Sequence, residues 1–301
     1  MNRLIHTLAL FALLLVAPLA RAELKVLACE PEWGALVKEL AGDKVSVYVA
    51  TTALQDPHRI EARPSLVAAA RNAGLVVCTG AELEVGWLPL LIRQSGNSAI
   101  QPGKPGHFEA AAYVRMLDVP QRLDRADGDV HAAGNPHIQT DPRNIALVAE
   151  PLALRLAELD PANAATYQAR SADFLTRWKA AIQRWEQSAA PLRGVPVVVQ
   201  HKAFPYLQQW LGLVEVAALE PKPGVEPTSA HLSTVLAGLK TRPAKMILRA
   251  AYNDPRGADW LAERTQLPVV VLPFTVGGNE QAKDLFSLFD DTVQRLLKAN
   301  R

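Results

Sequence analysis

The segment from Asp160 to about residue 189 constrains the fold of this chain more than any other feature. It opens with Asp160-Pro161, a helix cap followed by proline in the first turn, and it ends before Pro191 and Gly194. Its bulky residues recur at spacings of three and four, as in a helix with one buried face: Tyr167, Ser171, Phe174, Trp178, Ile182 and Trp185. Such a helix spans about 40 Å. It predicts a rigid connection between two separate parts of the chain.

On either side of this segment, short runs of strand-forming residues alternate with helix-like segments. This alternation is typical of a parallel sheet whose strands are connected by helices. Before the long helix, strands are predicted at 23–30, 44–50 and 75–80, and helices at 31–42 and 63–74. After it, strands are predicted at 195–200, 244–250 and 267–274, and helices at 231–241, 257–265 and 284–299.

The sequence therefore predicts an α/β protein of two doubly wound lobes joined by one long rigid helix. We expect the N-terminal lobe at 23–160, the linking helix at 161–190 and the C-terminal lobe at 191–301. Ligands of open parallel sheets bind beyond the carboxyl ends of the strands. A site in the cleft between the lobes is therefore expected.

The first 22 residues, MNRLIHTLALFALLLVAPLARA, are expected to form a secretory signal peptide. Arg3 provides a positive start, the apolar run from Leu8 to Ala17 is too short to span a bilayer, and Ala20-Arg21-Ala22 fits a cleavage site. An N-terminal membrane anchor is the disfavoured alternative, and no cysteine stands at the cleavage point to carry a lipid. We expect export to the periplasm, without membrane insertion after cleavage.

The net charge argues against a nucleic-acid partner. Arg3 and Arg21 belong to the predicted signal, so the mature chain carries 30 basic and 30 acidic residues. A nucleic-acid-binding protein would need a basic stripe or patch.

Three of the seven histidines fall on loops that could border the cleft. His58 comes shortly after the strand at 44–50, and His201 directly follows the strand at 195–200. His137 lies in GNPHIQTDP, where two prolines are expected to form a stiff exposed corner. Each histidine taken singly would be an ordinary surface or cap residue. Together, three imidazoles at such positions predict a site for Zn²⁺.

Three stretches, QDPHRIEARPS, NPHIQTDP and HKAFPYLQQWLGL, occur in this order along the chain. They resemble the Asp-Pro-His…Pro-Ser, Asn-Pro-His-x-Trp-Leu-Asp-Pro and His-x-Ala-Phe-x-Tyr-Phe…Gly-Leu motifs of the ZnuA-like (cluster A-I) solute-binding proteins of zinc and manganese ABC transporters. The resemblance covers almost the whole mature chain. It implies two α/β lobes on a rigid linking helix, with a metal held between the lobes by His58, His137 and His201.

The resemblance implies a monomeric solute-binding protein, not an enzyme, that captures Zn²⁺ and delivers it to the membrane permease and ATPase of an ABC transporter. Mn²⁺ is the alternative metal, although three nitrogen donors favour zinc. Two other classes are alternatives, a zinc hydrolase or lyase with a three-histidine site and a bilobal receptor for another ligand such as a metal chelate or haem. An enzyme would need a general base near the metal and a substrate pocket, and the sequence shows neither clearly.

The chain departs from the family where a fourth ligand is expected. The family has an Asp or Glu near the last strand, whereas this chain reads VVVLPFTVGGNE, with Pro273, Phe274 and Val276 at the candidate positions. Three neutral donors alone would leave the charge of the metal uncompensated. The candidates for the fourth position are Glu280, His131, Asp284 and water. The acidic loop that contains His131, with Asp118, Asp124, Asp127 and Asp129, is interpreted as solvated.

Cys29 and Cys78 each end a predicted strand, and the first and third strands are neighbours in a doubly wound sheet. A disulfide bond is expected in an oxidising compartment, and two buried thiols are the alternative. Glu82 and Glu84 are expected to be structural rather than a catalytic pair. His107 is expected at the start of a helix.

Overall fold

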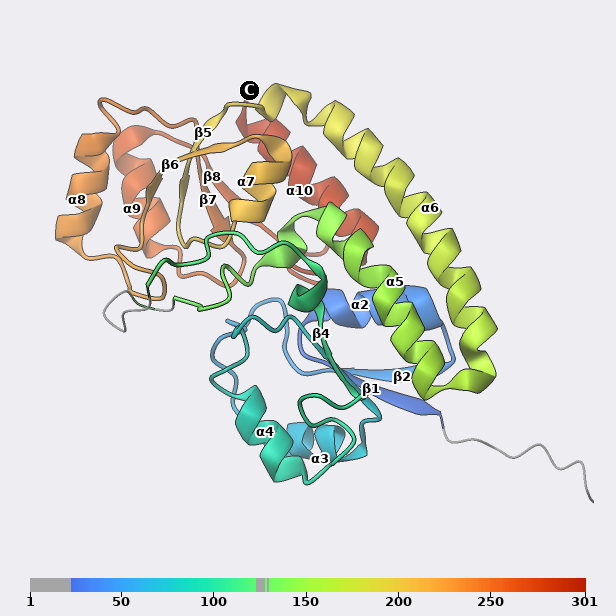
Figure 1. Ribbon diagram of the computed structural model, residues 1–301. Coiled ribbons are helices and arrows are strands. Elements are labelled where there is room, and N and C mark those ends of the chain that lie inside the picture. The colour runs from blue at the N-terminus through green and yellow to red at the C-terminus, as the bar shows by residue number, and fades with distance from the viewer. Residues whose placement is uncertain (1–22, 123–127, 129) are drawn as a thin grey trace, which may run out of the picture.

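Two four-stranded parallel sheets form the framework of the protein (Figure 1). The computed structural model describes residues 23–122, 128 and 130–301, so the predicted signal peptide and Asp124, Asp127 and Asp129 lie outside the described residues. The N-terminal sheet has the order β2-β1-β3-β4, and the C-terminal sheet has the order β6-β5-β7-β8. Their strands are β1 (Leu24–Ala28), β2 (Val45–Val49), β3 (Leu75–Cys78), β4 (His107–Glu109), β5 (Pro196–Val199), β6 (Val214–Ala218), β7 (Met246–Ala250) and β8 (Val269–Leu272). The prediction of two doubly wound α/β lobes is confirmed.

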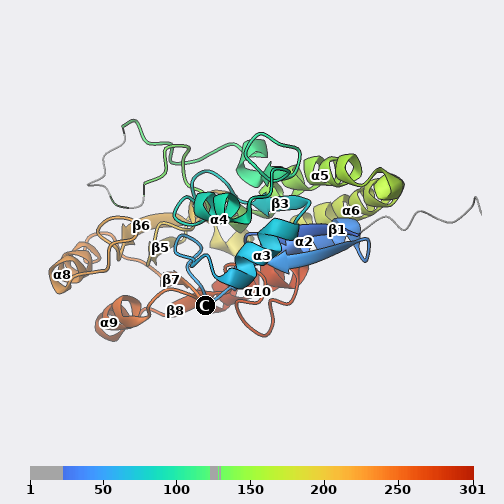
Figure 2. The ribbon, with the colours of Figure 1, turned by 90° about the horizontal axis from the view of Figure 1, so that it is seen from below.

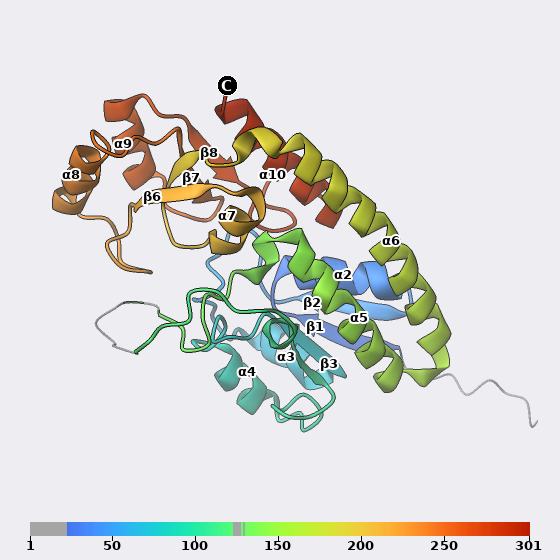
Figure 3. The same cartoon turned by 45° about the horizontal axis from the view of Figure 1, so that its top comes forward.

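Each sheet has an outer face that packs on two helices of its own lobe. On the N-terminal sheet these are α3 (Pro64–Asn72) and α4 (Leu88–Ser95), seen in Figure 2, and they enclose a core that contains Leu27, Val76 and Leu91. On the C-terminal sheet they are α8 (Ser229–Gly238) and α9 (Arg256–Thr265), which lie on the side away from the long helix in Figure 3.

The inner faces of both sheets share one continuous hydrophobic core. It includes Val26 of β1 and Val197 of β5, which belong to different sheets. Four helices contribute to it besides the long one: α2 (Pro31–Ala41), α5 (Pro142–Leu159), α7 (Pro205–Leu211) and α10 (Leu285–Ala299). The two sheets are therefore joined by buried apolar contact as well as by the chain.

The long helix α6 (Ala164–Ser188) runs along both lobes (Figure 1). Its predicted apolar stripe is confirmed, because Tyr167, Phe174, Trp178 and Trp185 are all buried. The indole of Trp178 donates a hydrogen bond to the carbonyl of Pro142 in the N-terminal lobe at 2.7 Å. The indole of Trp185 donates to Asp290 of α10 in the C-terminal lobe at 2.6 Å. Short 3-10 turns, η4 (Pro161–Asn163) and η5 (Ala190–Leu192), flank the helix.

The predicted disulfide bond is present. Cys29, directly after β1, is bonded to Cys78 at the end of β3, and their Cα atoms lie 4.8 Å apart. Because β1 and β3 are adjacent and parallel, their carboxyl ends bring the two cysteines together. The disulfide bond therefore joins β1 and β3 at the carboxyl ends of the strands, the edge of the sheet where ligands are expected.

Several elements were not predicted from the sequence. The prediction for His107 is wrong, since it begins the short strand β4, and its ring contacts Glu109 two residues later on the same face of the strand. Helix α5 was missed although it has 18 residues, and it contains Pro151 in its interior. Within the described residues, no helix is both long and apolar enough to cross a membrane.

Candidate metal centre

Three histidines meet at the carboxyl ends of the two sheets. His58 follows β2, His201 follows β5, and His137 precedes the 3-10 turn η3 (Ile138–Thr140) that leads to α5. The ring centroids are 5.3 Å apart for His58 and His137, 5.5 Å for His137 and His201, and 6.0 Å for His58 and His201. One nitrogen of each ring lies within 4.8 Å of the other two. The three predicted residues are close enough for a single ion to reach all of them after small side-chain movements.

The loop that carries His58 is fixed by an aspartate and a tryptophan. Asp56 Oδ1 accepts a hydrogen bond from the His58 amide at 3.0 Å and lies 2.7 Å from its Nδ1. Trp87 donates its indole N–H to the carbonyl of Pro57 at 2.9 Å. Because the carboxylate engages Nδ1, Nε2 is the nitrogen left for a metal. This Nε2 is buried without a hydrogen-bond partner.

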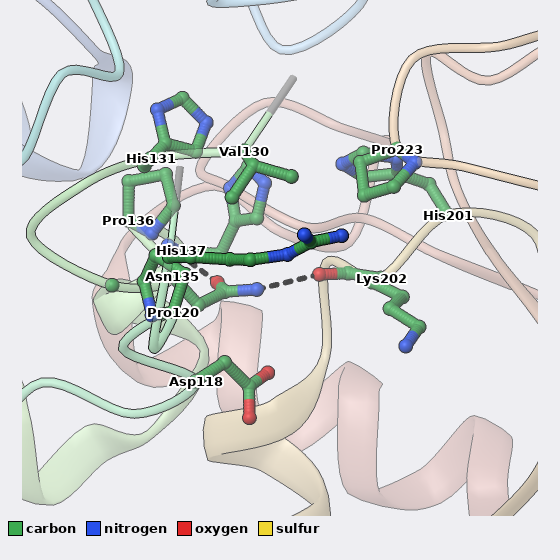
Figure 4. A pocket seen from close by; sticks show the side chains of 12 residues that line it. Asp118, Pro120, Val130, His131, Asn135, Pro136, His137, His201, Lys202 and Pro223 are labelled. Atoms are coloured by element: carbon green, nitrogen blue, oxygen red, sulfur yellow. Dashed lines mark hydrogen bonds between the residues drawn. The ribbon is translucent and has the colours of Figure 1, made fainter. Parts of the chain in front are cut away.

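The prediction that His137 stands on an exposed corner is wrong, because loops of the C-terminal lobe cover it. Only 1% of its surface is exposed. The carboxamide of Asn135 accepts a hydrogen bond from the His137 amide at 3.1 Å and donates one to the carbonyl of Lys202 at 2.7 Å (Figure 4). The hydroxyl of Tyr206 donates to the carbonyl of Asn135 at 2.8 Å. These bonds attach the His137 loop to the segment that follows His201.

His201 is held by a glutamate from the neighbouring strand. Its Nδ1 lies 2.6 Å from Oε2 of Glu220, which comes shortly after β6. The same oxygen accepts a hydrogen bond from the amide of Gly224 at 2.8 Å. Because β5 and β6 are adjacent in the sheet, their ends bring the histidine and the glutamate into contact. As with His58, the carboxylate leaves Nε2 as the free nitrogen.

Asp56 and Glu220 supply the negative charge that three neutral imidazoles lack. Each carboxylate is bonded to the ring nitrogen that is not available to a metal. Such a carboxylate fixes the orientation of a ligating ring and increases its basicity. The structure thus adds two carboxylates, directly behind two of the rings, to the three neutral donors that the sequence predicts.

His137 is in the form that binds metals. Burial lowers the pKa of His137 well below its ordinary value, and the nearby His58, His201 and His131 lower it further. Its Nδ1 is buried and has no hydrogen-bond partner. A neutral imidazole with an unpaired nitrogen is the state in which histidine acts as a metal ligand.

None of the side chains predicted for the fourth position joins the three histidines. Glu280 is exposed, and Asp284 instead caps α10, where its Oδ1 accepts from the amide of Ser287 at 2.7 Å. The ring of His131 stacks on His58 with centroids 5.4 Å apart, outside the close group of nitrogens. Phe274 packs its ring against His137 at a centroid distance of 5.4 Å. Over residues 23–122, 128 and 130–301, no carboxylate oxygen joins the group of three nitrogens that lie within 4.8 Å of one another.

The buried carboxyl groups of Glu30 and Glu32 line a small cavity, together with Gln139 and Phe274. Glu32 of α2 accepts a hydrogen bond from the hydroxyl of Thr275, so it joins the N-terminal lobe to the segment after β8. Burial raises the pKa of Glu32 to about 7, although the bond from Thr275 opposes this shift. Burial and the nearby carboxylates of Glu84 and then Glu32 raise the pKa of Glu30 well above its ordinary value.

Glu82 and Glu84 do not form a catalytic pair. Glu84 is buried and accepts hydrogen bonds from the amides of Thr79 at 2.8 Å and Gly80 at 3.1 Å. Glu82 accepts a hydrogen bond from the amide of Ala132 at 2.6 Å. Both carboxylates therefore position backbone, as expected for structural residues.

Sequence reasoning missed the two carboxylates behind the rings. A signal was present for Asp56, which stands two residues before His58, a spacing at which an Asp side chain commonly bonds to backbone and side chain. Glu220 gave no local signal, since 19 residues separate it from His201.

Comparisons with known proteins agree with this arrangement. The profile of the family described as "Zinc-uptake complex component A periplasmic" (ZnuA) matches residues 26–299. The high-affinity zinc uptake system protein ZnuA of Paracoccus denitrificans (strain Pd 1222) is 26% identical over 271 residues, covering 79% of each chain. The manganese ABC transporter substrate-binding lipoprotein PsaA of Streptococcus pneumoniae is 23% identical over 290 residues, covering 91% of this chain and 90% of its own. A crystal structure of ZnuA superimposes with a TM-score of 0.77 at 23% identity, over 92% of this chain and 99% of that one.

Proposed function

Since the chain belongs to the ZnuA family, the periplasmic solute-binding components of metal ABC transporters, we propose that it captures Zn²⁺ through His58, His137 and His201. It then delivers the ion to the membrane permease and ATPase of such a transporter. The observation that carries the proposal is the convergence of three imidazoles from three loops, with buried ring nitrogens of His58 and His137 left without hydrogen-bond partners. An unpaired buried nitrogen is costly unless a ligand satisfies it.

Zinc is proposed over manganese on the basis of the donor set. Relatives of this chain include a protein named for zinc uptake and one named for manganese transport, so the family alone supports a divalent metal. The three close donors of this chain are imidazoles. Manganese prefers carboxylate and other oxygen ligands, whereas zinc readily accepts three nitrogens.

The organisation that we propose follows from the family and the sequence. Residues 1–22 are a signal peptide that directs the chain to the periplasm. The lobes at 23–160 and 191–301 are joined by the linking helix at 161–190, and the protein acts as a monomer. The permease and the ATPase remain its partners in transport.

A zinc-dependent hydrolase is disfavoured by the groups around the histidines. A general base would have to be free to take a proton from bound water. The two carboxylates next to the rings, Asp56 and Glu220, already bind ring nitrogens at 2.7 and 2.6 Å.

The proposal is tested by metal content and competition. We expect purified mature protein to bind one Zn²⁺ per chain in a chelator titration and to prefer Zn²⁺ to Mn²⁺. Replacing His58, His137 or His201 by Ala should each weaken binding at least tenfold. His231→Ala is the matched control, because His231 lies on α8 and bonds to the carbonyl of Ala218. Wild-type affinity in all three variants would contradict the proposal, and ester or CO₂ hydration that follows zinc occupancy would favour the enzyme instead.

A further inference from the structure

A cavity of about 470 Å³ opens beside the histidines, and its size suits a small organic molecule rather than a bare ion. Its walls include His137 and His201 of the centre, and His131 beside them. In Figure 4 His131 and His137 lie on the left and His201 on the right, while the ends of the Asp118 and Lys202 side chains point towards the lower part of the view.

The cavity carries cations that no described carboxylate neutralises. Arg122 and Lys202 both line it and both are exposed, and neither forms an ion pair with any residue that the structure describes. Asp118 is the acidic residue in the described wall, so the two cations leave an excess of one positive charge there. Asp56 and Glu220 already offset the charge of a bound divalent ion, so the attraction of the cavity for an anion comes from Arg122 and Lys202.

The centre itself leaves one coordination position for a ligand from outside. Zinc takes four donors, and within residues 23–122, 128 and 130–301 three close nitrogens are available to it. Phe274, one of the three positions considered for the family's carboxylate, packs its ring against His137 and offers no oxygen. The fourth donor must then come from water or from a molecule in the cavity.

We propose that the protein takes up its metal together with a small polycarboxylate, one carboxylate completing the coordination of the ion and another resting between Arg122 and Lys202. This inference rests on the proposed function, because the three histidines hold the metal in both. It names the substrate class as a metal complex of an anionic chelator. The three-histidine centre supplies the affinity for the ion, and the two cations supply the selection for the chelator.

Citrate is the probe for this proposal, and acetate is the matched control because it has a single carboxylate. The mature protein is loaded with Co²⁺, whose visible absorption reports its coordination. We expect citrate to change the spectrum saturably and native mass spectrometry to record one chain, one metal and one citrate. Acetate at the same concentration should bind much more weakly, since it cannot reach the metal and the cations together.

The double variant Arg122→Gln/Lys202→Gln should weaken citrate binding by roughly tenfold, the effect of two partly exposed charge pairs. Its affinity for Zn²⁺ alone should stay within about twofold of wild type, because neither side chain is in the group of close donors. Lys240→Gln/Lys245→Gln removes two exposed cations elsewhere on the C-terminal lobe and should leave citrate binding unchanged.

The inference is overturned if citrate only strips the metal from the protein, or if the Arg122 and Lys202 variant binds citrate as wild type does. Either result would leave zinc binding by the histidines intact. Loss of the proposed function would look different, because wild-type protein would then fail to bind Zn²⁺ in the absence of any chelator.

Discussion

Asp56 and Glu220 contact the rings of His58 and His201, two of the three proposed metal ligands. Each carboxylate contacts Nδ1 of one imidazole and leaves its Nε2 for a metal. His137 differs, since its ring packs on Phe274 and its loop is fixed through Asn135. At the scale of single residues, the proposed centre therefore consists of three histidines and of the two carboxylates that orient His58 and His201.

We expect Asp56→Asn and Glu220→Gln each to weaken Zn²⁺ binding by roughly 10- to 100-fold, the usual cost of losing a carboxylate behind a ligating histidine. The amide keeps the size of the side chain but removes its charge. Asp173→Asn is the control, because Asp173 lies exposed on α6. A chelator titration measures the affinities, and unchanged values in both variants would show that the carboxylates do not act on the metal.

Glu32 should make the stability of the metal-free protein depend on pH. Its pKa is raised by burial from an ordinary 4.5 to about 7, so the native form holds a proton that the unfolded form has lost. Its contribution to stability is therefore full below about pH 4.5 and is lost as the pH rises through 7. The lowered pKa of His137 acts in the opposite sense and destabilises the native form below about pH 6.5.

We expect Glu32→Gln to gain stability relative to wild type between pH 5 and pH 8, because glutamine can still accept a hydrogen bond from Thr275 without being charged. Urea unfolding at both pH values, with a chelator present, measures the difference. Glu263→Gln, on an exposed part of α9, is the control, and its free energy of unfolding relative to wild type should be the same at pH 5 and pH 8. If the difference in unfolding free energy between Glu32→Gln and wild type is also the same at both pH values, this carboxyl does not titrate in the native form in that range.

Helix α6 packs on both lobes and hydrogen-bonds to each of them. Its indoles bond once to each lobe, through Pro142 and Asp290, and its aromatic side chains belong to the shared core. The regular spacing of these aromatics made α6 predictable from the sequence. Helix α5, its main packing partner, was missed because Pro151 interrupts a pattern that would otherwise read as helix.

Truncation of the indole stripe should destabilise the whole protein. Trp178 is completely buried and stacks on Phe174, so we expect Trp178→Ala to lower the free energy of unfolding by about 3–5 kcal/mol. Leu154→Ala removes an apolar side chain that is 57% exposed on α5, and its effect should stay within about 0.5 kcal/mol. Denaturant unfolding of both variants makes the comparison. Similar small effects would mean that α6 is not part of the cooperative core.

The whole molecule is built around a core that both sheets share. The architecture could be predicted because strand and helix alternate on each side of a conspicuous helix. Of the candidate centre, His58, His137 and His201 could be predicted, because recognisable motifs carry them. What escaped prediction depends on tertiary contact: Glu220 reaches His201 only once β5 and β6 pair, and His137 is buried only once the Asn135 carboxamide meets the Lys202 loop.

The shared core should keep the lobes from swinging widely when the metal binds. Apolar residues of both sheets and α6 would lose contact if the cleft opened through a large angle. We expect the radius of gyration, measured by small-angle scattering, to change by less than about 1 Å between chelator-treated and Zn²⁺-loaded protein, since hinge motion needs flexible crossings. A change of several ångströms would contradict this.

Unfolding of the wild type should also occur in one transition, because the lobes share their core.

The joining of the lobes by α6 has a consequence for how metal-free and metal-loaded protein compete for the permease. If the empty and loaded forms keep almost the same outline, a permease that docks on both lobes meets nearly identical surfaces in the two cases. Empty protein should then occupy the docking site and compete with loaded protein. Uptake in a reconstituted system would therefore fall when metal-free protein is added in excess, even though the supply of metal is unchanged.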